Sequence, residues 1–216
     1  MVAREYVPIA NLLPLIEISC QGVPRSVALF ELRQAYNDFC NRTWLWQSDI
    51  IPFAIQDGVD EYELTTTAEY SQPYLVQALS ADGMPLTSVA NVEVERSKNF
   101  GKYHEKQGKP KFYIAKDAGI VEIYPKEVDV VITGRLILAP TDDAEMMPKS
   151  IYTDFGRCIS YMVKAALMMQ PNKPWTNPQL ATLNIQLSNQ LIDDALHKAS
   201  RGHSAAPKRR VKSYFY

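Results

Sequence analysis

The sequence predicts an α+β fold in which the N- and C-terminal segments form a helical bundle that carries a β-rich, sandwich- or barrel-like insertion. Three observations support this prediction. Apolar residues recur every three or four positions near both ends, short β-branched and aromatic runs fill the middle, and the last residues show no apolar period. We therefore divide the chain into a bundle (1–48 and 148–199), an insertion (49–147) and an extended C-terminal arm (200–216).

The N-terminal part is predicted to contain two helical segments. Residues 9–20 form a short apolar helix or helical turn, in which Pro14 either kinks the helix or starts it. Residues 25–42 form an amphipathic helix, and Ser26 is the candidate N-cap. The apolar side of this second helix carries Leu29, Leu32, Tyr36, Phe39 and Cys40.

Two further helices are predicted near the C-terminus. Residues 148–169 carry an apolar stripe, and Gly156 inside it would let a neighbouring helix approach closely. Asn177 is a good N-cap for a last helix over 178–199, and Pro178 suits its first position. The stripes predicted to face the core are Ile151, Phe155, Ile159, Met162, Ala166 and Met169 in the first helix, and Leu180, Leu183, Leu187, Leu191 and Ala195 in the second.

The middle of the chain reads as six or seven short strands. They are separated by turn signals such as Asp57-Gly58 and Asp82-Gly83, a spacing typical of small sandwiches and barrels. Residues 96–110, which include His104, are polar and predict an exposed, mobile loop. The predicted strands are 51–55, 61–64, 74–79, 89–95, 111–115, 120–124 and 128–138.

The tryptophans Trp44, Trp46 and Trp175 suggest two uses. Indoles can stack on sugars or bases, which would indicate a ligand site. The simpler interpretation is that the three rings fill the joint between the helical layer and the inserted sheet.

The sequence lacks the common motifs of catalytic and nucleotide-binding sites. The zinc motif HExxH, the nucleophile elbow GxSxG and the phosphate-binding loops GxxxxGK[ST] and GxGxxG are all absent. The carboxylate doublets at 60–61, 142–143 and 193–194 are interpreted as solvated faces. We therefore expect no enzymatic activity, no metal and no other cofactor.

The cysteines and the hydropathy pattern favour a protein made in the cytosol. Cys20, Cys40 and Cys158 are odd in number and far apart, so we expect buried thiols rather than disulfides. The N-terminus lacks the apolar run and cleavage site of a signal peptide. No stretch approaches the roughly 20 apolar residues that span a bilayer, so we expect no membrane partner.

Charge is distributed unevenly along the chain. Residues 1–197 hold 17 basic and 24 acidic residues, a formal net charge of −7, whereas residues from 198 onward carry +6. The acidic body argues against a domain that grips DNA. The tail has three interpretations: docking to a protein partner through aromatic anchors, nonspecific nucleic-acid binding, or a solubilising terminus. Its functional candidates are Lys208, Arg209, Arg210, Lys212, Tyr214, Phe215 and Tyr216.

Several segments together resemble the head-to-tail adaptor proteins of bacteriophages. The resemblance is strongest in residues 32–46, with the pattern Phe-Cys-x-Arg-Thr-x-x-Trp, and in residues 170–178, with Lys-Pro-Trp-x-Asn-Pro. Shorter matches lie between these segments, and the resemblance covers residues 10 to 200. These shorter matches are Gly58, 62–64, 123–125, 138–140 and Pro148.

The resemblance implies a structural virion protein. Such adaptors form a ring, commonly of twelve copies, beneath the portal protein, extend the DNA channel, and provide the platform for the tail or other neck proteins. By the resemblance, residues 200–216 would be the portal-docking arm, and packaged DNA would pass through the lumen without sequence recognition. The protein would assemble in the host cytoplasm and end at the head-tail junction of the virion.

Other functions remain open. The first is another neck or tail-completion structural protein. The second is a DNA-binding protein that uses the basic, aromatic tail. The third and least supported is a cell-wall hydrolase carried on the particle, for which the sequence supplies no residue set.

Overall fold

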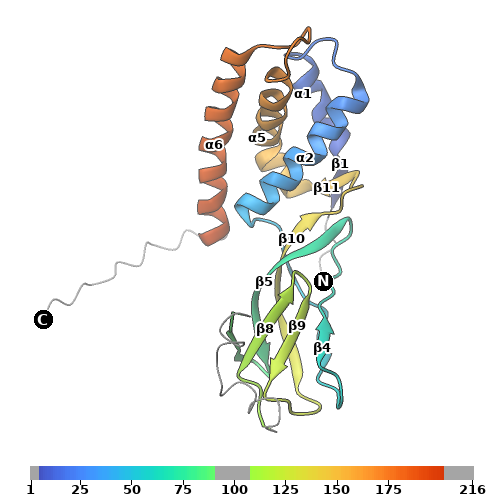
Figure 1. The fold of residues 1–216 in the computed structure, drawn as a ribbon, viewed down its shortest axis with the longest axis vertical. Coiled ribbons are helices and arrows are strands. Elements are labelled where there is room, and N and C mark those ends of the chain that lie inside the picture. Colours follow the sequence, from blue (N-terminus) through green and yellow to red (C-terminus); the bar gives the residue numbers. More distant parts are fainter. Residues whose placement is uncertain (1–4, 91–107, 202–216) are drawn as a thin grey trace, which may run out of the picture.

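The computed structural model describes residues 5–90 and 108–201 and shows a mixed α+β fold (Figure 1). Helices occupy one end of an elongated molecule, and most strands occupy the other. In chain order the elements are β1 (Tyr6–Pro8), the 3-10 helix η1 (Ile9–Leu12), α1 (Leu13–Glu17), α2 (Arg25–Thr43), β2 (Gln47–Asp49), β3 (Phe53–Ala54), β4 (Glu61–Glu63), β5 (Ser71–Ala81), β6 (Met84–Pro85), β7 (Thr87–Ser88), β8 (Phe112–Asp117), β9 (Ile120–Tyr124), β10 (Val131–Pro140), β11 (Met146–Pro148), α5 (Lys149–Met168) and α6 (Pro178–Arg201).

Helices α2 and α5 both begin directly after a proline in extended conformation. Pro24 and Pro148 occupy the N-cap positions, and neither supplies a side-chain cap. The prediction that Ser26 caps α2 is therefore wrong, because Ser26 lies within the first turn. The carbonyl of Pro24 accepts hydrogen bonds from the backbone N–H groups of Val27 and Ala28. The helix therefore starts at a residue whose φ is fixed by its ring, and it does so without a polar side-chain cap.

Helix α5 packs against α1, α2 and α6. The rings of Phe39 in α2 and Phe155 in α5 lie 5.4 Å apart, and the Cys158 thiol donates a hydrogen bond to the Ser188 carbonyl of α6 at 3.5 Å. The predicted close approach at Gly156 is confirmed. A Cβ at this position would lie 2.8 Å from Cδ2 of Leu12 in η1.

The core face of α5 differs from the predicted stripe in its second half. Ile151, Phe155 and Ile159 are buried as expected, whereas Ala166 and Met169 are exposed. Helix α5 has neighbours on several sides, so residues outside the predicted stripe are buried as well. The further buried residues are Gly156, Cys158, Ser160, Val163, Ala165, Leu167 and Met168.

The strands form three hydrogen-bonded groups. One sheet has the order β2-β10-β5-β6, with β3 also paired to β10; a second has the order β4-β9-β8-β7; and β1 pairs with β11. All pairs are antiparallel except β7 with β8. Apolar side chains of both larger sheets belong to the same core as the helices, for example Leu79, Val121 and Ile132. The predicted strand over 89–95 lies largely outside the described residues.

One of the three tryptophans fills the joint between helices and strands. Trp46 is buried, and its ring stacks on that of Tyr36 in α2 with centroids 6.0 Å apart. The same prediction is wrong for the other two. Trp44 ends α2 in a left-handed conformation and is 48 % exposed. Trp175 lies in the α5–α6 loop, where its indole N–H donates a hydrogen bond to Gln170 at 3.2 Å.

The start of α6 agrees with the prediction from sequence. Pro178 is the first helical residue, and the Asn177 side chain accepts a hydrogen bond from the Leu180 backbone N–H at 3.1 Å. We expect Asn177→Ala to lower the free energy of unfolding by about 1 kcal/mol, measured by urea denaturation followed by circular dichroism. Asn177→Asp keeps a capping oxygen and is the matched control. A loss in the control as large as that in the alanine variant would contradict the capping role.

Candidate interaction surfaces

The predicted C-terminal arm lies almost entirely outside the described residues. This holds for every candidate side chain in it: Lys208, Arg209, Arg210, Lys212, Tyr214, Phe215 and Tyr216. Helix α6 continues through Arg201, so it includes the first two residues of the predicted arm, 200 and 201. The segment that follows the helix therefore begins at residue 202. Most of the predicted polar loop over 96–110, including His104, also lies outside the described residues.

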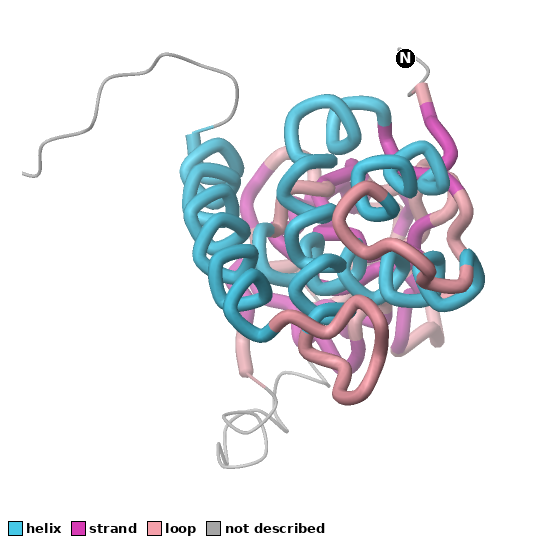
Figure 2. Tube along the Cα trace, turned by 90° about the horizontal axis from the view of Figure 1, so that it is seen from above, coloured by secondary structure: helices cyan, strands magenta, loops and turns pink. Residues whose placement is uncertain are grey.

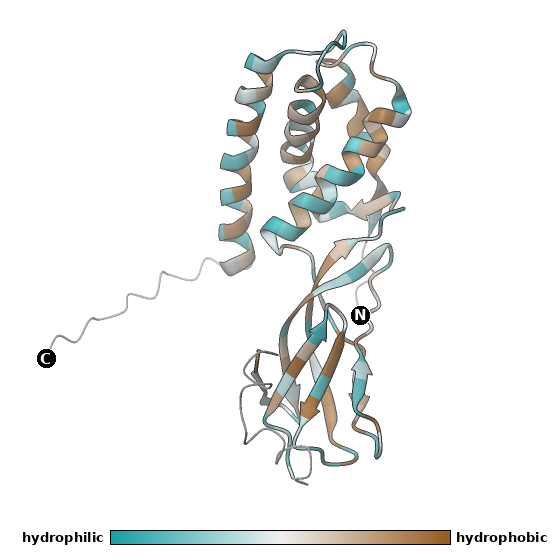
Figure 3. Cartoon of the chain, viewed as in Figure 1, coloured by the Kyte–Doolittle hydropathy of each residue, from teal (hydrophilic) through white to brown (hydrophobic). Residues whose placement is uncertain are grey.

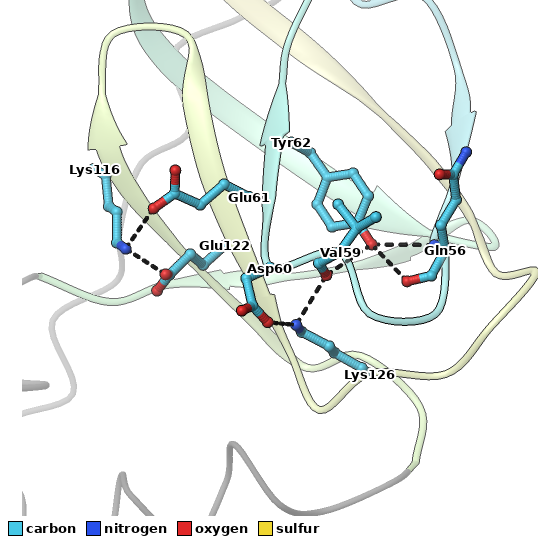
Figure 4. Close-up of polar contacts among 8 residues, drawn as sticks. All are labelled: Gln56, Val59, Asp60, Glu61, Tyr62, Lys116, Glu122 and Lys126. Atoms are coloured by element: carbon cyan, nitrogen blue, oxygen red, sulfur yellow. Dashed lines mark hydrogen bonds and ion pairs between the residues drawn. The ribbon is translucent and has the colours of Figure 1, made fainter.

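A group of polar contacts joins β4 and the turn before it to the β8–β9 hairpin (Figure 4). Lys116 lies between two carboxylates, with its Nζ 2.7 Å from Glu61 and 2.5 Å from Glu122. These hydrogen bonds, first that of Glu122 and then that of Glu61, raise the pKa of Lys116 above its usual value. Lys126 forms an ion pair with Asp60 and also donates to the Val59 carbonyl at 2.9 Å. Each carboxylate of the network thus faces a lysine.

A tyrosine hydroxyl fixes the turn that precedes β4. The Tyr62 hydroxyl accepts a hydrogen bond from the Gln56 N–H at 3.1 Å and lies 3.2 Å from the Gln56 carbonyl and 3.3 Å from that of Val59 (Figure 4). The Tyr62 ring is buried and stacks on Phe53, with centroids 5.0 Å apart. The ion pairs of Lys116 and Lys126 with Asp60, Glu61 and Glu122 help to fix this turn against the sheet.

The three thiols are buried and free, as predicted. Burial raises the pKa of Cys158 to about 12 and raises the pKa values of Cys20 and Cys40 above the usual range. A thiol must ionise to act as a nucleophile or to bind a metal. These side chains therefore serve as small apolar groups of the core.

The remaining titratable groups are dispersed in the part of the chain that the structure describes. Within residues 5–90 and 108–201, no three His, Cys, Asp or Glu side chains gather in a way that could hold a metal ion. Asp142, Asp143, Asp193 and Asp194 are exposed, as predicted. Among the described helices, none combines the length and apolar character needed to cross a membrane.

A shallow, open depression lies on the sheet that contains β2, β5 and β10. Its lining includes the ion pair between Arg135 and Asp49, with Nε and Oδ1 3.0 Å apart, the polar side chains of Gln77, Ser80 and Thr133, and small or apolar residues. The depression is open to solvent rather than an enclosed cavity.

Helix α6 leaves several of its leucines largely outside the core. The residues that face α5 are small or polar apart from Ile192, whereas Leu180 and Leu183 are 45 % and 49 % exposed and Leu187 and Leu191 are half-buried. The prediction that these leucines form the core-facing stripe is thus wrong for Leu180 and Leu183, whereas Leu191 packs against the core and Ala195 is buried as expected. The buried face consists of Ala181, Asn184, Ser188, Ile192 and Ala195. Figure 3 shows apolar positions along the whole length of α6.

Large apolar side chains are also exposed on the helices on the other side of α5. Ile18, at the end of α1, is 75 % exposed, Leu15 in α1 is 41 % exposed, and Phe30 in α2 is 58 % exposed. The sequence offered one signal that the leucines of α6 need not all be buried. Helix α6 also has apolar residues on another side, at Ile185, Ile192 and Leu196. A helix that is apolar on several sides is expected to have neighbours on several sides.

Comparison with known proteins adds no family to this picture. No protein-family model matches the chain, and no curated protein matches its sequence.

Proposed function

We propose that this chain is a structural virion protein, a bacteriophage head-to-tail adaptor that forms a ring beneath the portal. It extends the DNA channel and provides the platform on which the tail or other neck proteins attach. Its partners are the portal protein, neighbouring copies in a ring of about twelve, and neck or tail proteins, and packaged DNA passes through the lumen. The protein assembles in the host cytoplasm and acts at the head-tail junction, without enzymatic activity or a cofactor.

The observation that carries this proposal is how the two ends of the chain meet. Helices α1 and α2, from the N-terminal part, contact α5, and α2 also contacts α6. The strands lie between these helices in sequence and extend to the other end of the molecule (Figure 1). This arrangement supports a helical bundle (1–48 and 148–199) with a β-rich insertion (49–147), the architecture that the resemblance to adaptors implies.

The surfaces described above support a binding role rather than a catalytic one. The described helices expose large apolar side chains, which single soluble subunits seldom present in quantity. The acidic body suits a channel wall, because like charges let a polyanion slide without adhesion. The basic, aromatic segment after α6 then supplies the portal-docking arm, with its aromatic residues as anchors and its lysines and arginines as partners for an acidic groove.

Truncation after Arg201 tests this proposal. Helix α6 ends at Arg201, so deleting 202–216 leaves every described element intact. We expect an unchanged free energy of unfolding but a loss of portal affinity on the order of 100-fold or more, because several aromatic anchors are removed together. Co-purification with the portal protein and single-particle imaging of the complex measure the effect. Full-strength portal binding by the truncated chain would rule out the arm.

A charge variant separates docking from nucleic-acid binding. Changing Lys208, Arg209 and Arg210 to alanine leaves Tyr214, Phe215 and Tyr216 in place. If the tail docks to the portal, the variant keeps measurable binding through its aromatic anchors, and the unmodified chain is not retained on DNA at moderate salt. The DNA-binding alternative makes three different predictions: the full chain is retained on DNA, the alanine variant is not, and neither binds the portal. That set of results would replace the adaptor function with DNA binding.

A further inference from the structure

A lysine near the end of α6 contacts two consecutive side chains of α5. The Nζ atom of Lys198 lies 3.1 Å from Oδ2 of Asp154 and 4.9 Å from the ring centroid of Phe155. Lys198 comes three residues after the fully buried Ala195, so both side chains leave α6 on the same face. Lys198, Asp154 and Phe155 are together called the lysine clasp.

The α5 side of the lysine clasp is fixed by packing. Phe155 is buried, and its ring lies 5.4 Å from that of Phe39 in α2. A displacement of the Phe155 ring would therefore disturb the core between α2 and α5. The Lys198 side chain is 47 % exposed and reaches this point through a flexible four-carbon stem. The lysine clasp thus ties the end of α6 to a position that the core holds in place.

The lysine clasp lies where a small tilt of α6 has its largest effect. Helix α6 forms one edge of the helical layer (Figures 1 and 2). It has 24 residues, which corresponds to a length of about 36 Å, so a tilt of about 5° at its start would move its end by about 3 Å. Lys198 lies less than one turn before Arg201, the last residue of the helix. A contact at this place restrains the end of α6 more than a contact near its start would.

We propose that Lys198 is a positioning residue. Its contact with Asp154 and Phe155 fixes where the segment after Arg201 leaves the molecule, and in which direction. The biological role of this contact rests on the proposed function, in which that segment is the portal-docking arm. An arm that starts from a fixed point explores a smaller volume, so its effective concentration at the portal groove is higher. Lys198 thus raises portal affinity through the arm, without itself touching the portal.

Distances between spin labels test the positioning directly. One label is attached at Ser26→Cys, an exposed position at the start of α2, and the other at Ser204→Cys, three residues after α6. The native thiols are buried, so labelling is confined to the two new cysteines. We expect pulsed electron paramagnetic resonance to give one narrow distance distribution. After Lys198→Gln the distribution should become about twofold wider, because the axis of α6 is then free to tilt.

Two further variants serve as controls for the spin-label distances. Lys198→Arg keeps a charge that can pair with Asp154 and stack on Phe155, so the narrow distribution should return. Lys164→Gln removes a lysine whose Nζ lies 5.3 Å from the ring centroid of Tyr161, within α5 itself. It removes the same kind of contact but leaves the lysine clasp in place, so the distribution should stay narrow. Equal broadening by Lys164→Gln would overturn the specific role of Lys198.

Portal affinity is the second measurement. In the full chain, we expect Lys198→Gln to weaken portal binding about three- to tenfold, and Lys198→Arg to restore it. In the chain truncated after Arg201, Lys198→Gln should have no further effect on the remaining binding, because no arm is left to position. A loss of the same size in the truncated chain would indicate a general effect on the fold and overturn the proposal.

The two measurements separate this inference from the proposed function. If Lys198→Gln broadens the distribution in a chain whose unmodified form does not bind the portal, the positioning is supported and the adaptor function is refuted. If the distribution keeps its width after Lys198→Gln, the positioning is overturned even where the portal is bound. A wider distribution with full portal affinity would overturn the link between positioning and docking.

Discussion

Replacing Phe39 with alanine is expected to lower the free energy of unfolding by about 3–5 kcal/mol, the usual cost of removing a fully buried aromatic ring. Phe39 has no exposed surface, and its ring lies 5.4 Å from that of Phe155. The side chain therefore joins α2, from the N-terminal part of the chain, to α5, from the C-terminal part. Urea denaturation followed by far-ultraviolet circular dichroism measures the loss.

Phe30→Ala is the matched control for this prediction. It is the same substitution on the same helix, but at a side chain that is 58 % exposed. At concentrations where the chain is monomeric, we expect a change within about 0.5 kcal/mol. If both variants lost the same stability, the burial of Phe39 between α2 and α5 would not explain its effect.

The second large effect is expected at Gly134 in β10. A Cβ at this position would lie 2.4 Å from the carbonyl oxygen of Ala78 and 3.1 Å from Cα of Leu79, both backbone atoms of the paired strand β5. Since backbone atoms within a sheet cannot move aside without breaking the ladder, Gly134→Ala should cost about 3 kcal/mol, as overpacking of a core does. A lower midpoint in the same urea titration is the expected readout.

Gly156→Ala provides the contrast for the Gly134 prediction. Its added Cβ would meet the end of the Leu12 side chain, which can rotate, and alanine favours a helix over glycine by about 1 kcal/mol. The two terms oppose each other, so the net change should stay within about 1 kcal/mol. If both variants lost the same stability, the difference between a backbone neighbour at Gly134 and a side-chain neighbour at Gly156 would not matter.

The elements that the sequence predicts well are those with local signals. The period of apolar residues predicts α2, α5 and α6 to within two residues at each end, and Asn177-Pro178 marks the start of α6 correctly. Strands β1 and β11 are only three residues long, and each ends in a proline. Their pairing joins residues far apart in the sequence, so no local pattern predicts it.

The orientation of α6 could not be predicted for a different physical reason. Both a leucine stripe and a small-residue face are present in its sequence, and hydrophobicity alone favours burying the leucines. The packing of α5 determines which face of α6 is buried, because the two helices lie so close that small side chains fit between them. The exposure of Leu180 and Leu183 therefore follows from the packing of α6 on α5, and the predicted site residues of the C-terminal arm lie outside the described residues.

Trp46 and Leu138 hold the two ends of the β-rich region together. The Leu138 N–H donates a hydrogen bond to the Trp46 carbonyl at 2.7 Å, so the chain leaves the helices and returns to them at adjacent positions. The chain between Trp46 and Leu138 therefore leaves and rejoins the helical region at two points that a hydrogen bond holds together. Doubling the length of a loop such as that at Asp57-Gly58 costs only about 0.6 kcal/mol of closure entropy. The reach of the β-rich end can therefore change by insertion or deletion while the spacing of the helices stays constant.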